Sequence, residues 1–374
     1  MSEWIDREAA LAALGIRAQT LYAYVSRGRI GMRPDPTDPR RSLYRTDDIA
    51  ALTSRRARGR RPAAIAASTI AWGEPAIATG IATVHHGRLI YRGEDAIAFA
   101  ETATLEETAA LLWSVKPVPT LAGNGKCHDD PFLALAARIA ASAPAMGRAP
   151  ALLCRDAASV IGVLAGALGA GEGDAPVHLR LAEAWSLDGE ATDVVRRALV
   201  LLADHELNAS TFAVRVAAST GASMAASLLA GLGALSGPRH GGAGEAVTAL
   251  VEDADRTTPA MAVARWLARG EQLPGFGHPL YPAGDARAYA LLERLPPDDL
   301  FTALRAAAAE ATGALPNIDF ALAALTRAYA LPRDTPFRLF ALGRSIGWAA
   351  HAMEQVTSGQ LIRPRAHYDG AYPA

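Results

Sequence analysis

Apolar residues recur at three- and four-residue spacing along most of this chain, which is the pattern of amphipathic helices. Thr104 and Glu107 form a capping-box pattern at the start of the first of these predicted helices. Alanine and glycine are abundant at helical spacing and let helices approach closely. We therefore expect a mainly α fold with a large, tightly packed helical body. The clearest helical segments are 105–113, 132–140, 177–185 and 192–203.

One short segment before these helices has a different pattern. Residues 81–84 and 88–91 alternate apolar and polar side chains on either side of His85-His86-Gly87. Alternation around a turn that contains glycine predicts a β-hairpin.

The first 62 residues have the pattern of a small separate module. Asp6 can cap a helix that ends near Gly15, and a second helix with Leu21 and Val25 on one side follows after a short connection. The pattern resembles the winged helix-turn-helix of small regulators of the MerR and excisionase type. Such a module would bind DNA. The alternative is that its arginines only solvate a small helical domain. The candidate DNA-binding residues are Arg27, Arg29, Arg40 and Arg41.

Composition supports this division of the chain. The 374 residues are 51% hydrophobic and 20% charged with a formal net charge of -1, so the chain as a whole has no field that attracts nucleic acid or a membrane. Residues 1–62 contain 13 arginines and 7 acidic residues, a net charge of +6, which leaves -7 on the remainder. The asymmetry indicates a module with its own partner, and residues 55–62 read as a basic linker.

The cysteine count and the chain start bear on location. Two cysteines, Cys127 and Cys154, argue against a disulfide scaffold and fit a reducing cytoplasm. The first residues lack a basic region followed by an apolar run. Apolar stretches such as 160–168 contain glycine and are too short to span a bilayer. We expect a cytoplasmic protein without membrane segments.

Common cofactor and metal motifs are missing. The sequence has no phosphate-binding loop with a Walker lysine, no Cys-x-x-Cys pair and no His-Glu-x-x-His helix. We therefore expect no bound metal and no permanently bound cofactor.

Three histidines and one aspartate have distinctive surroundings. His205 lies in Asp-His-Glu-Leu-Asn-Ala-Ser, His240 in Gly-Pro-Arg-His-Gly-Gly and His278 in Gly-Phe-Gly-His. A helix N-terminus or a glycine turn can present an imidazole to a ligand and lower its pKa, which keeps it a neutral hydrogen-bond donor. Any one such histidine is more often structural than catalytic. Asp319 lies among apolar residues, where desolvation raises the pKa of a carboxylate and makes it a stronger base.

These segments, in this order, resemble the citrate synthase family. Further motifs that fit are Leu-Ile-Tyr-Arg-Gly at 89–93, Asn-Ile-Asp at 317–319 and Arg-Pro-Arg at 363–365. The similarity covers roughly residues 70–370 and excludes the N-terminal module. It implies a citrate synthase-like fold with a large helical domain of residues 63–242 and 326–374, and a small helical domain of residues 243–325.

The resemblance also implies a reaction and roles for particular residues. The enzyme would condense acetyl-CoA, a cosubstrate, with oxaloacetate to give citrate and CoA. Asp319 would take a proton from the acetyl methyl group, His240 would donate to the thioester oxygen, and His278 would polarise the ketone. Guanidinium groups suit a dicarboxylate because their paired N–H donors match its oxygens. The implied substrate contacts are His205, Arg287, Arg344 and Arg363.

In the family the last of these arginines reaches across a dimer interface, which implies a homodimer. The residues that bind CoA are not assigned, because Pro282 stands where a basic residue is common. Gly244 likewise replaces a common asparagine. Two alternatives stay open at this point. One is a 2-methylcitrate synthase that uses propionyl-CoA, because one methylene changes selectivity by only about 1 to 3 kcal/mol. The other is a DNA-binding regulator whose body senses a metabolite.

Overall fold

The computed structural model describes residues 4–14, 21, 24–25, 30–35, 38, 41–50, 77–123, 128–366 and 370. The chain divides into two compact units. The N-terminal unit comprises residues 1–77 together with 363–374, and the main unit comprises residues 78–362.

The described part of the N-terminal unit is a small antiparallel sheet with helical segments, among them residues 7–14 and 46–50. Strands β1 (Trp4–Ile5), β2 (Met32–Pro34) and β3 (Ser42–Arg45) lie in the order β1-β3-β2, and α1 (Arg7–Leu14) follows β1. Asp6 accepts a hydrogen bond from the backbone N–H of Ala9, so the predicted cap of this helix is confirmed. The unit has its own apolar core of Ala10, Leu14, Leu21, Ile30, Tyr44 and Ile49.

The winged helix-turn-helix stays a prediction, because most of its second helix lies outside the described residues. Arg27, Arg29 and Arg40 also lie outside them. Arg41 is described; its side chain is exposed and lies 3.6 Å from a carboxylate oxygen of Asp38.

The main unit begins with a second three-stranded antiparallel sheet and is otherwise helical. In the sheet β4 (Ala82–His85) pairs with β5 (Arg88–Tyr91), and β5 pairs with β6 (Glu94–Asp95). The predicted hairpin is therefore confirmed. Thr104 and Glu107 form the predicted capping box. The helices are α5 (Ala96–Phe99), α6 (Leu105–Trp113), α7 (Pro131–Ala140), α8 (Pro150–Ala165), α9 (Val177–Trp185), α10 (Gly189–Leu202), α11 (Ala209–Ser219), α12 (Met224–Leu235), α13 (Ala243–Arg256), α14 (Pro259–Leu267), α15 (Ala286–Leu292), α16 (Asp299–Thr312), α17 (Ile318–Ala328) and α18 (Thr335–Ser358).

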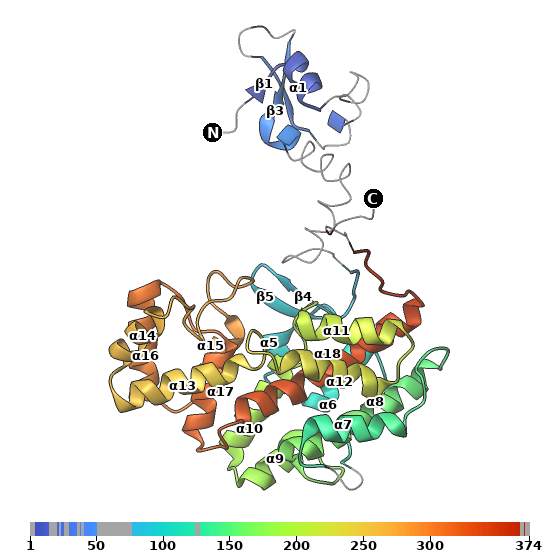
Figure 1. Ribbon diagram of the computed structural model, residues 1–374, viewed down its shortest axis with the longest axis vertical. Helices are drawn as coiled ribbons and strands as arrows, with labels where there is room; N and C mark the ends of the chain where they lie inside the picture. Colours follow the sequence, from blue (N-terminus) through green and yellow to red (C-terminus); the bar gives the residue numbers. More distant parts are fainter. Residues whose placement is uncertain are drawn as a thin grey trace. The chain divides into compact units, whose positions relative to one another are not determined.

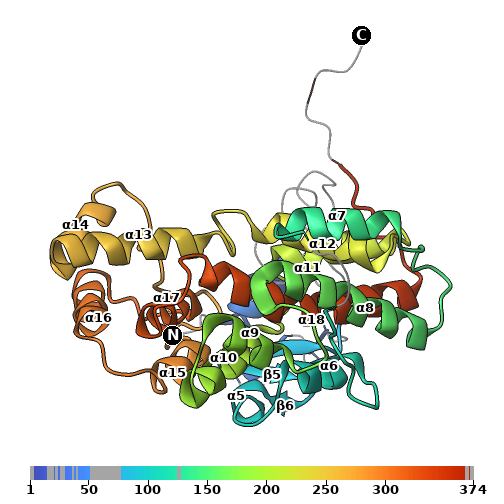
Figure 2. The same ribbon diagram turned by 90° about the horizontal axis from the view of Figure 1, so that it is seen from below.

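Two apolar cores lie within the main unit. The larger one joins the hairpin, α5–α12, α15, α17 and α18, and the smaller one joins α13, α14, α16 and the other face of α17. Figures 1 and 2 both show α13, α14 and α16 at one side of the main unit, away from α6–α12. The smaller core draws its residues from 247–324, inside the range predicted for the small domain, whose boundaries stay a prediction.

Helix α18 is the central element of the main unit. It packs against α6, α8, α10, α11 and α12, and most of its side chains are buried. Gly347 permits the close approach of the segment that follows α10, because a Cβ at this position would lie 2.4 Å from the carbonyl oxygen of Ala203 and from Oδ1 of Asp204. This contact brings the segment that carries His205 alongside the helix that carries Arg344.

The apolar stretch of residues 160–168 belongs to a longer segment, Pro150–Ala170. The segment comprises α8 and a π-helical turn (η1, Gly166–Ala170), and Gly169 within this turn has a non-helical backbone (φ 97°). The expectation that the apolar segment is too short is wrong as to length. By length and composition it is long enough to cross a membrane, but half of the relevant window is buried inside the protein. Its buried side chains belong to the larger core. The contacts are thus those of a core helix.

Candidate active site

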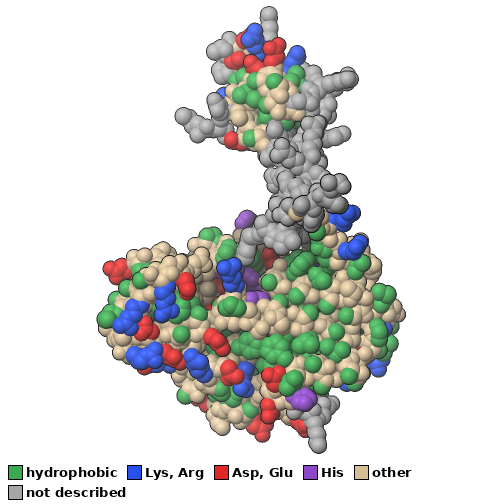
Figure 3. All heavy atoms as spheres, viewed as in Figure 1, with side chains coloured by type: hydrophobic (Ala, Val, Ile, Leu, Met, Phe, Trp, Pro, Cys, Tyr) green, Lys and Arg blue, Asp and Glu red, His purple; other side chains and the backbone are tan. Residues whose placement is uncertain are grey.

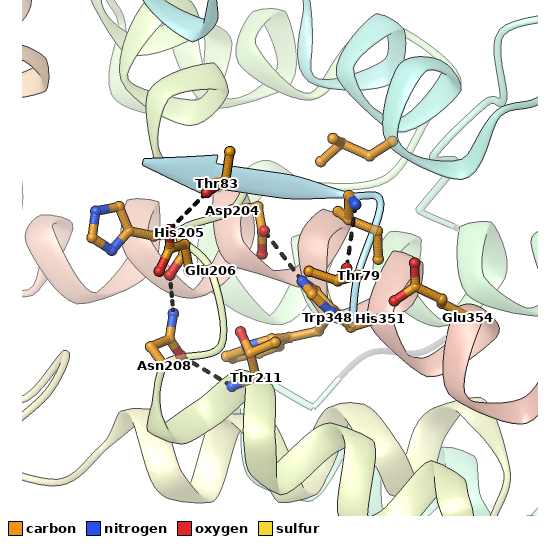
Figure 4. Close-up of polar contacts among 12 residues, drawn as sticks. Thr79, Thr83, Asp204, His205, Glu206, Asn208, Thr211, Trp348, His351 and Glu354 are labelled. Carbon is orange, nitrogen blue, oxygen red and sulfur yellow. Dashed lines mark hydrogen bonds and ion pairs between the residues drawn. The ribbon is translucent and has the colours of Figure 1, made fainter. Parts of the chain in front are cut away.

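His205 lies on the connection between α10 and α11, which is fixed on both sides. Glu206 has a left-handed backbone (φ 53°), a conformation that is costly for a residue with a side chain. Its carboxylate accepts hydrogen bonds from the hydroxyl of Thr83 (3.0 Å) and from the backbone N–H of Val84 (2.7 Å), both on β4. Asn208 caps α11 through the backbone N–H of Thr211. These contacts hold the backbone of His205 in place (Figure 4).

Asp204 connects the same segment to α18. Its Oδ2 lies 3.2 Å from Nε2 of His351, and Nδ1 of His351 accepts a hydrogen bond from Nε of Arg215 (2.9 Å). Because Nδ1 is the acceptor, the proton of His351 lies on Nε2 and points to the carboxylate. Arg215 also pairs with Glu354. All but Glu354 are buried, and Figure 4 shows Asp204 directed at His351.

His240 lies in the turn between α12 and α13 and faces α11 and α18. Its Nε2 is 2.7 Å from the hydroxyl of Ser210 on α11, which also accepts a hydrogen bond from the indole N–H of Trp348 (3.1 Å). The ring of Phe340 meets the imidazole edge to face at 5.8 Å. Two helices, α11 and α18, therefore orient this histidine.

His278 lies in a glycine-rich loop before α15. Its Nδ1 accepts a hydrogen bond from the backbone N–H of Leu280 (3.1 Å), so a neutral His278 carries its proton on Nε2. Its ring lies 5.1 Å from that of His205, at a right angle. The loop also brings in Tyr281, whose hydroxyl is 2.8 Å from Nε2 of His205. Sequence reasoning missed this tyrosine; its position three residues after His278 was the available signal.

Asp319 lies in the first turn of α17, where Asn317 caps the helix by accepting the backbone N–H groups of Asp319 and Phe320. Burial raises the pKa of Asp319 from 3.8 to about 6, against the charges of Arg287 and Arg344, which lower it. The predicted direction of this shift is confirmed. A carboxylate with a pKa near neutrality is a stronger base than a free one and is still ionised at pH 7.

Arg287 is buried and has a fixed partner. Asp285 caps α15 and binds the guanidinium with both oxygens, at 3.0 Å to Nε and 2.8 Å to Nη2. Burial, the largest single effect, lowers the pKa of the guanidinium, but the charge and hydrogen bond of Asp285, together with Tyr281 and Tyr91, raise it overall. Arg287 is therefore a permanent cation, held by a residue that sequence reasoning did not assign.

Arg344 is a buried cation with few polar partners. It is 1% exposed, and its Nε donates to the carbonyl oxygen of Leu202 (2.9 Å). Its Nη2 is buried without a hydrogen-bond partner among the described residues. Burial lowers the pKa of Arg344 to about 10, so it is charged at pH 7. A buried cation with an unused donor is costly unless an anion completes it.

The three histidines are neutral at physiological pH. Burial, and then the charge of Arg344, lowers the pKa of His240 to about 4; burial, and then the charge of Arg287, does the same for His278. Burial and both arginines hold the pKa of His205 well below its ordinary value. The predicted direction is confirmed, and the cause is burial with two cations rather than a glycine turn. Each histidine can therefore act as a neutral donor.

The charges of two buried arginines act on the histidines and on the aspartate. The charge of Arg344 acts on His205, His240 and Asp319, and the charge of Arg287 acts on His205, His278 and Asp319. Figure 3 shows histidine side chains within a hollow on one face of the main unit. The combination of neutral donors, one base and two arginines suits an anionic ligand that contains a carbonyl group.

Two further predictions concern Arg363 and a metal site. Arg363 belongs to the N-terminal unit, and its part in the site stays a prediction. Within the described ranges, no three histidine, cysteine or acidic side chains gather to hold a metal ion.

Comparison with known proteins gives one family. The family model "Citrate synthase, C-terminal domain" matches residues 132–365. The 2-methylcitrate synthase of Mycobacterium tuberculosis is 38% identical over 187 residues, which are 46% of this chain and 47% of that protein. The citrate synthase of Haloferax volcanii is 38% identical over 185 residues, 46% of this chain and 49% of that protein. The matched region of the chain thus spans about half the length of these curated relatives.

The fold similarity extends further. The citrate synthase of Thermoplasma acidophilum, solved as a ternary complex with carboxymethyl coenzyme A and oxaloacetate, matches with a TM-score of 0.65 and 25% identity. The match covers 80% of this chain and 94% of that one.

Proposed function

The chain belongs to the citrate synthase family, and we therefore propose that it is an acyltransferase that condenses acetyl-CoA with oxaloacetate to give citrate and CoA. The observation that carries the proposal is the grouping of one carboxylate of raised pKa with neutral histidines around two buried arginines. Such a site can remove a proton from carbon and stabilise the oxyanions that follow.

In the proposed reaction Asp319 takes a proton from the acetyl methyl group, and the electrons of that C–H bond form the enolate. The enolate carbon then attacks the ketone of oxaloacetate and forms the new C–C bond. His278 presents Nε2–H, because its Nδ1 already accepts from Leu280, and this proton passes to the alkoxide. Water then cleaves the thioester of citryl-CoA to release citrate and CoA.

The role proposed for His240 depends on Ser210. The hydroxyl of Ser210 lies 2.7 Å from Nε2 of His240 and 2.8 Å from Oδ1 of Asn208, and its single proton can go to either of them. Oδ1 of Asn208 already accepts the backbone N–H of Thr211. When Ser210 donates to His240, the imidazole keeps its proton on Nδ1, which is then the donor to the thioester oxygen.

The dicarboxylate would be bound by His205, Arg287 and Arg344. The unpartnered Nη2 of Arg344 is the donor that an incoming carboxylate would complete. We further propose that Arg363 contributes from the second subunit of a homodimer. Equilibrium sedimentation of the wild-type protein tests the dimer, and a monomer with full activity would remove this role from Arg363.

The acyl group is the open part of the proposal, since one methylene changes selectivity by only about 1 to 3 kcal/mol. The test is the release of free thiol when the protein is mixed with oxaloacetate and either acetyl-CoA or propionyl-CoA. A higher kcat/KM with acetyl-CoA supports citrate synthase, and a higher kcat/KM with propionyl-CoA supports 2-methylcitrate synthase. Tight oxaloacetate binding without thiol release from either would favour a metabolite sensor.

DNA binding by residues 1–62 is a separate proposal, supported only by their net charge of +6 and the helix-turn-helix pattern. It predicts that the full chain is retained on DNA with an affinity that falls steeply with salt. Absence of retention at low salt would leave the module as a docking or packing domain.

A further inference from the structure

Tyr281 contacts three of the polar groups of the site. Its hydroxyl lies 2.8 Å from Nε2 of His205, and its ring centre lies 5.0 Å from that of His278. The guanidinium carbon of Arg287 lies 5.3 Å from the centre of the same ring. Tyr281 is only 3% exposed. It therefore has little freedom to move away from these neighbours.

The hydrogen bond to His205 can be made in two ways, and the surroundings of the donor that each way leaves unused separate them. Among the described residues, the tyrosine hydroxyl has no second hydrogen-bond partner, and Nδ1 of His205 has none either. Each way leaves one donor unused in the free protein. If His205 donates its Nε2–H, the unused donor is the hydroxyl proton of Tyr281, on a side chain that is only 3% exposed. If Tyr281 donates instead, the unused donor is Nδ1–H of His205, an atom that is not among the fully buried polar atoms without a partner and can be met by solvent or by a ligand. Burial of an unpaired donor is costly, so the second arrangement is favoured.

The second arrangement also suits the ligand. In the proposed function His205 contacts a dicarboxylate, which accepts hydrogen bonds and donates none. Only the form of His205 that carries its proton on Nδ1 can donate into the site while Nε2 remains bonded to the tyrosine. The pKa values agree with this picture, because burial raises the pKa of Tyr281 to about 12 and the hydroxyl stays protonated.

The geometry points to Tyr281 as a positioning residue for substrate binding, whose hydroxyl donates to Nε2 of His205 and so fixes the tautomer that presents Nδ1–H to the carboxylate of oxaloacetate. The inference rests on the proposed function for the identity of the anion. The tautomer itself is a property of the free protein. Tyr281 thereby acts on the substrate through His205 and takes no part in breaking or forming bonds.

The tautomer is measured by NMR of the full chain labelled with ¹⁵N in its histidine rings. The signals of His205 are those that disappear in His205→Gln. In the wild type, Nδ1 is expected to carry the proton and Nε2 to have the shift of an unprotonated nitrogen that accepts a hydrogen bond. A proton on Nε2 in the wild type would overturn the inference without any need for a variant.

Tyr281→Phe removes only the hydroxyl and is expected to let the proton of His205 redistribute between the two nitrogens. The matched control is Tyr329→Phe, because the hydroxyl of Tyr329 is buried without a hydrogen-bond partner among the described residues and lies outside the site. This control should reproduce the wild-type signals. Identical His205 signals in Tyr281→Phe and the wild type would contradict the role of the tyrosine.

Binding and kinetics supply the functional readout. Tyr281→Phe should weaken oxaloacetate binding about tenfold, the effect of one charge-assisted hydrogen bond, and leave the KM for the acyl-CoA nearly unchanged. Equal loss for both substrates would indicate general damage and count against a positioning role. If the wild type releases no thiol, the proposed function fails, whereas the tautomer of His205 in the free protein is decided separately.

Discussion

The backbone of Phe276 pairs with that of Pro316 in an isolated antiparallel bridge. On either side of it, the N–H of Gly277 donates to the carbonyl of Leu315 (2.7 Å), and the N–H of Asn317 donates to the carbonyl of Gly275 (2.9 Å). The bridge ties the loop that presents His278 to the start of the helix that presents Asp319, although 40 residues separate them in the chain.

Asn317→Ala tests this connection. Asn317 caps α17 and also donates from its side-chain amide to the carbonyl of Gly277 (3.1 Å). Loss of a cap should destabilise the protein by about 1 to 2 kcal/mol, and the displaced base should lower kcat by roughly tenfold or more. The control is Thr258→Ala, which removes the cap of α14. Urea unfolding should give similar losses for both, and a similar kcat for both would contradict the connection.

The pH dependence of the reaction follows from Asp319. A base with a pKa of about 6 must be ionised to act, so kcat/KM for the acyl-CoA should fall about tenfold per pH unit below pH 6. His240 and His278, each with a pKa of about 4, stay neutral through this range and add no second limb above pH 5. Initial rates between pH 4.5 and 8 provide the check. A constant rate down to pH 5 would exclude Asp319 as the base.

The same pKa makes a prediction about stability. Because its pKa is raised in the folded state, Asp319 stabilises the protein when protonated, and this contribution is lost as the pH rises from 3.8 through about 6. Asp319→Asn should therefore be more stable than the wild type at pH 7, by about 1 to 3 kcal/mol. Below pH 3.8 the two proteins should unfold alike. Denaturant titrations at pH 7 and pH 3.5 test this, and a variant that is less stable at pH 7 would argue against a destabilised carboxylate.

Arg344→Met tests whether the buried cation serves a ligand. Replacing an unpaired buried charge with an apolar side chain of similar size is often neutral or stabilising. The stability of the unliganded variant should therefore equal that of the wild type, while its affinity for oxaloacetate falls about thirtyfold or more. Arg180→Met is the contrasting control. Arg180 is also buried, but it donates to the carbonyls of Ala175, Gly171 and Leu121.

Arg180→Met should lose stability, by about 3 kcal/mol for three orphaned carbonyls, and keep its affinity for oxaloacetate once folded. Calorimetry and thermal unfolding of both variants separate the two roles. If Arg344→Met proves as unstable as Arg180→Met, Arg344 is a structural residue.

The sequence predicted those features that depend on local pattern. The hairpin at 82–91 and the capping box at Thr104 follow from alternation and from side chains three residues apart, and both are present. The raised pKa of Asp319 also followed from its apolar neighbours in the chain. Such features are determined by residues close in sequence.

Features that depend on contacts between distant segments could not be predicted in this way. Gly162 lies within α8, and a Cβ there would be 1.8 Å from the carbonyl oxygen of Ala122, a contact between segments 40 residues apart. The partnership of Tyr281 with His205 likewise joins residues 76 positions apart. No periodicity marks either contact, since each depends on how helices and loops pack.

The most direct test of the account is the condensation rate of Asp319→Asn, measured as thiol release with oxaloacetate and acetyl-CoA or propionyl-CoA, together with its affinity for oxaloacetate by calorimetry. The asparagine preserves shape but cannot accept the proton. We expect oxaloacetate affinity within a fewfold of the wild type and a rate reduced by roughly 10²- to 10⁴-fold. A variant that binds oxaloacetate and condenses it at a near-normal rate would show that the base lies elsewhere.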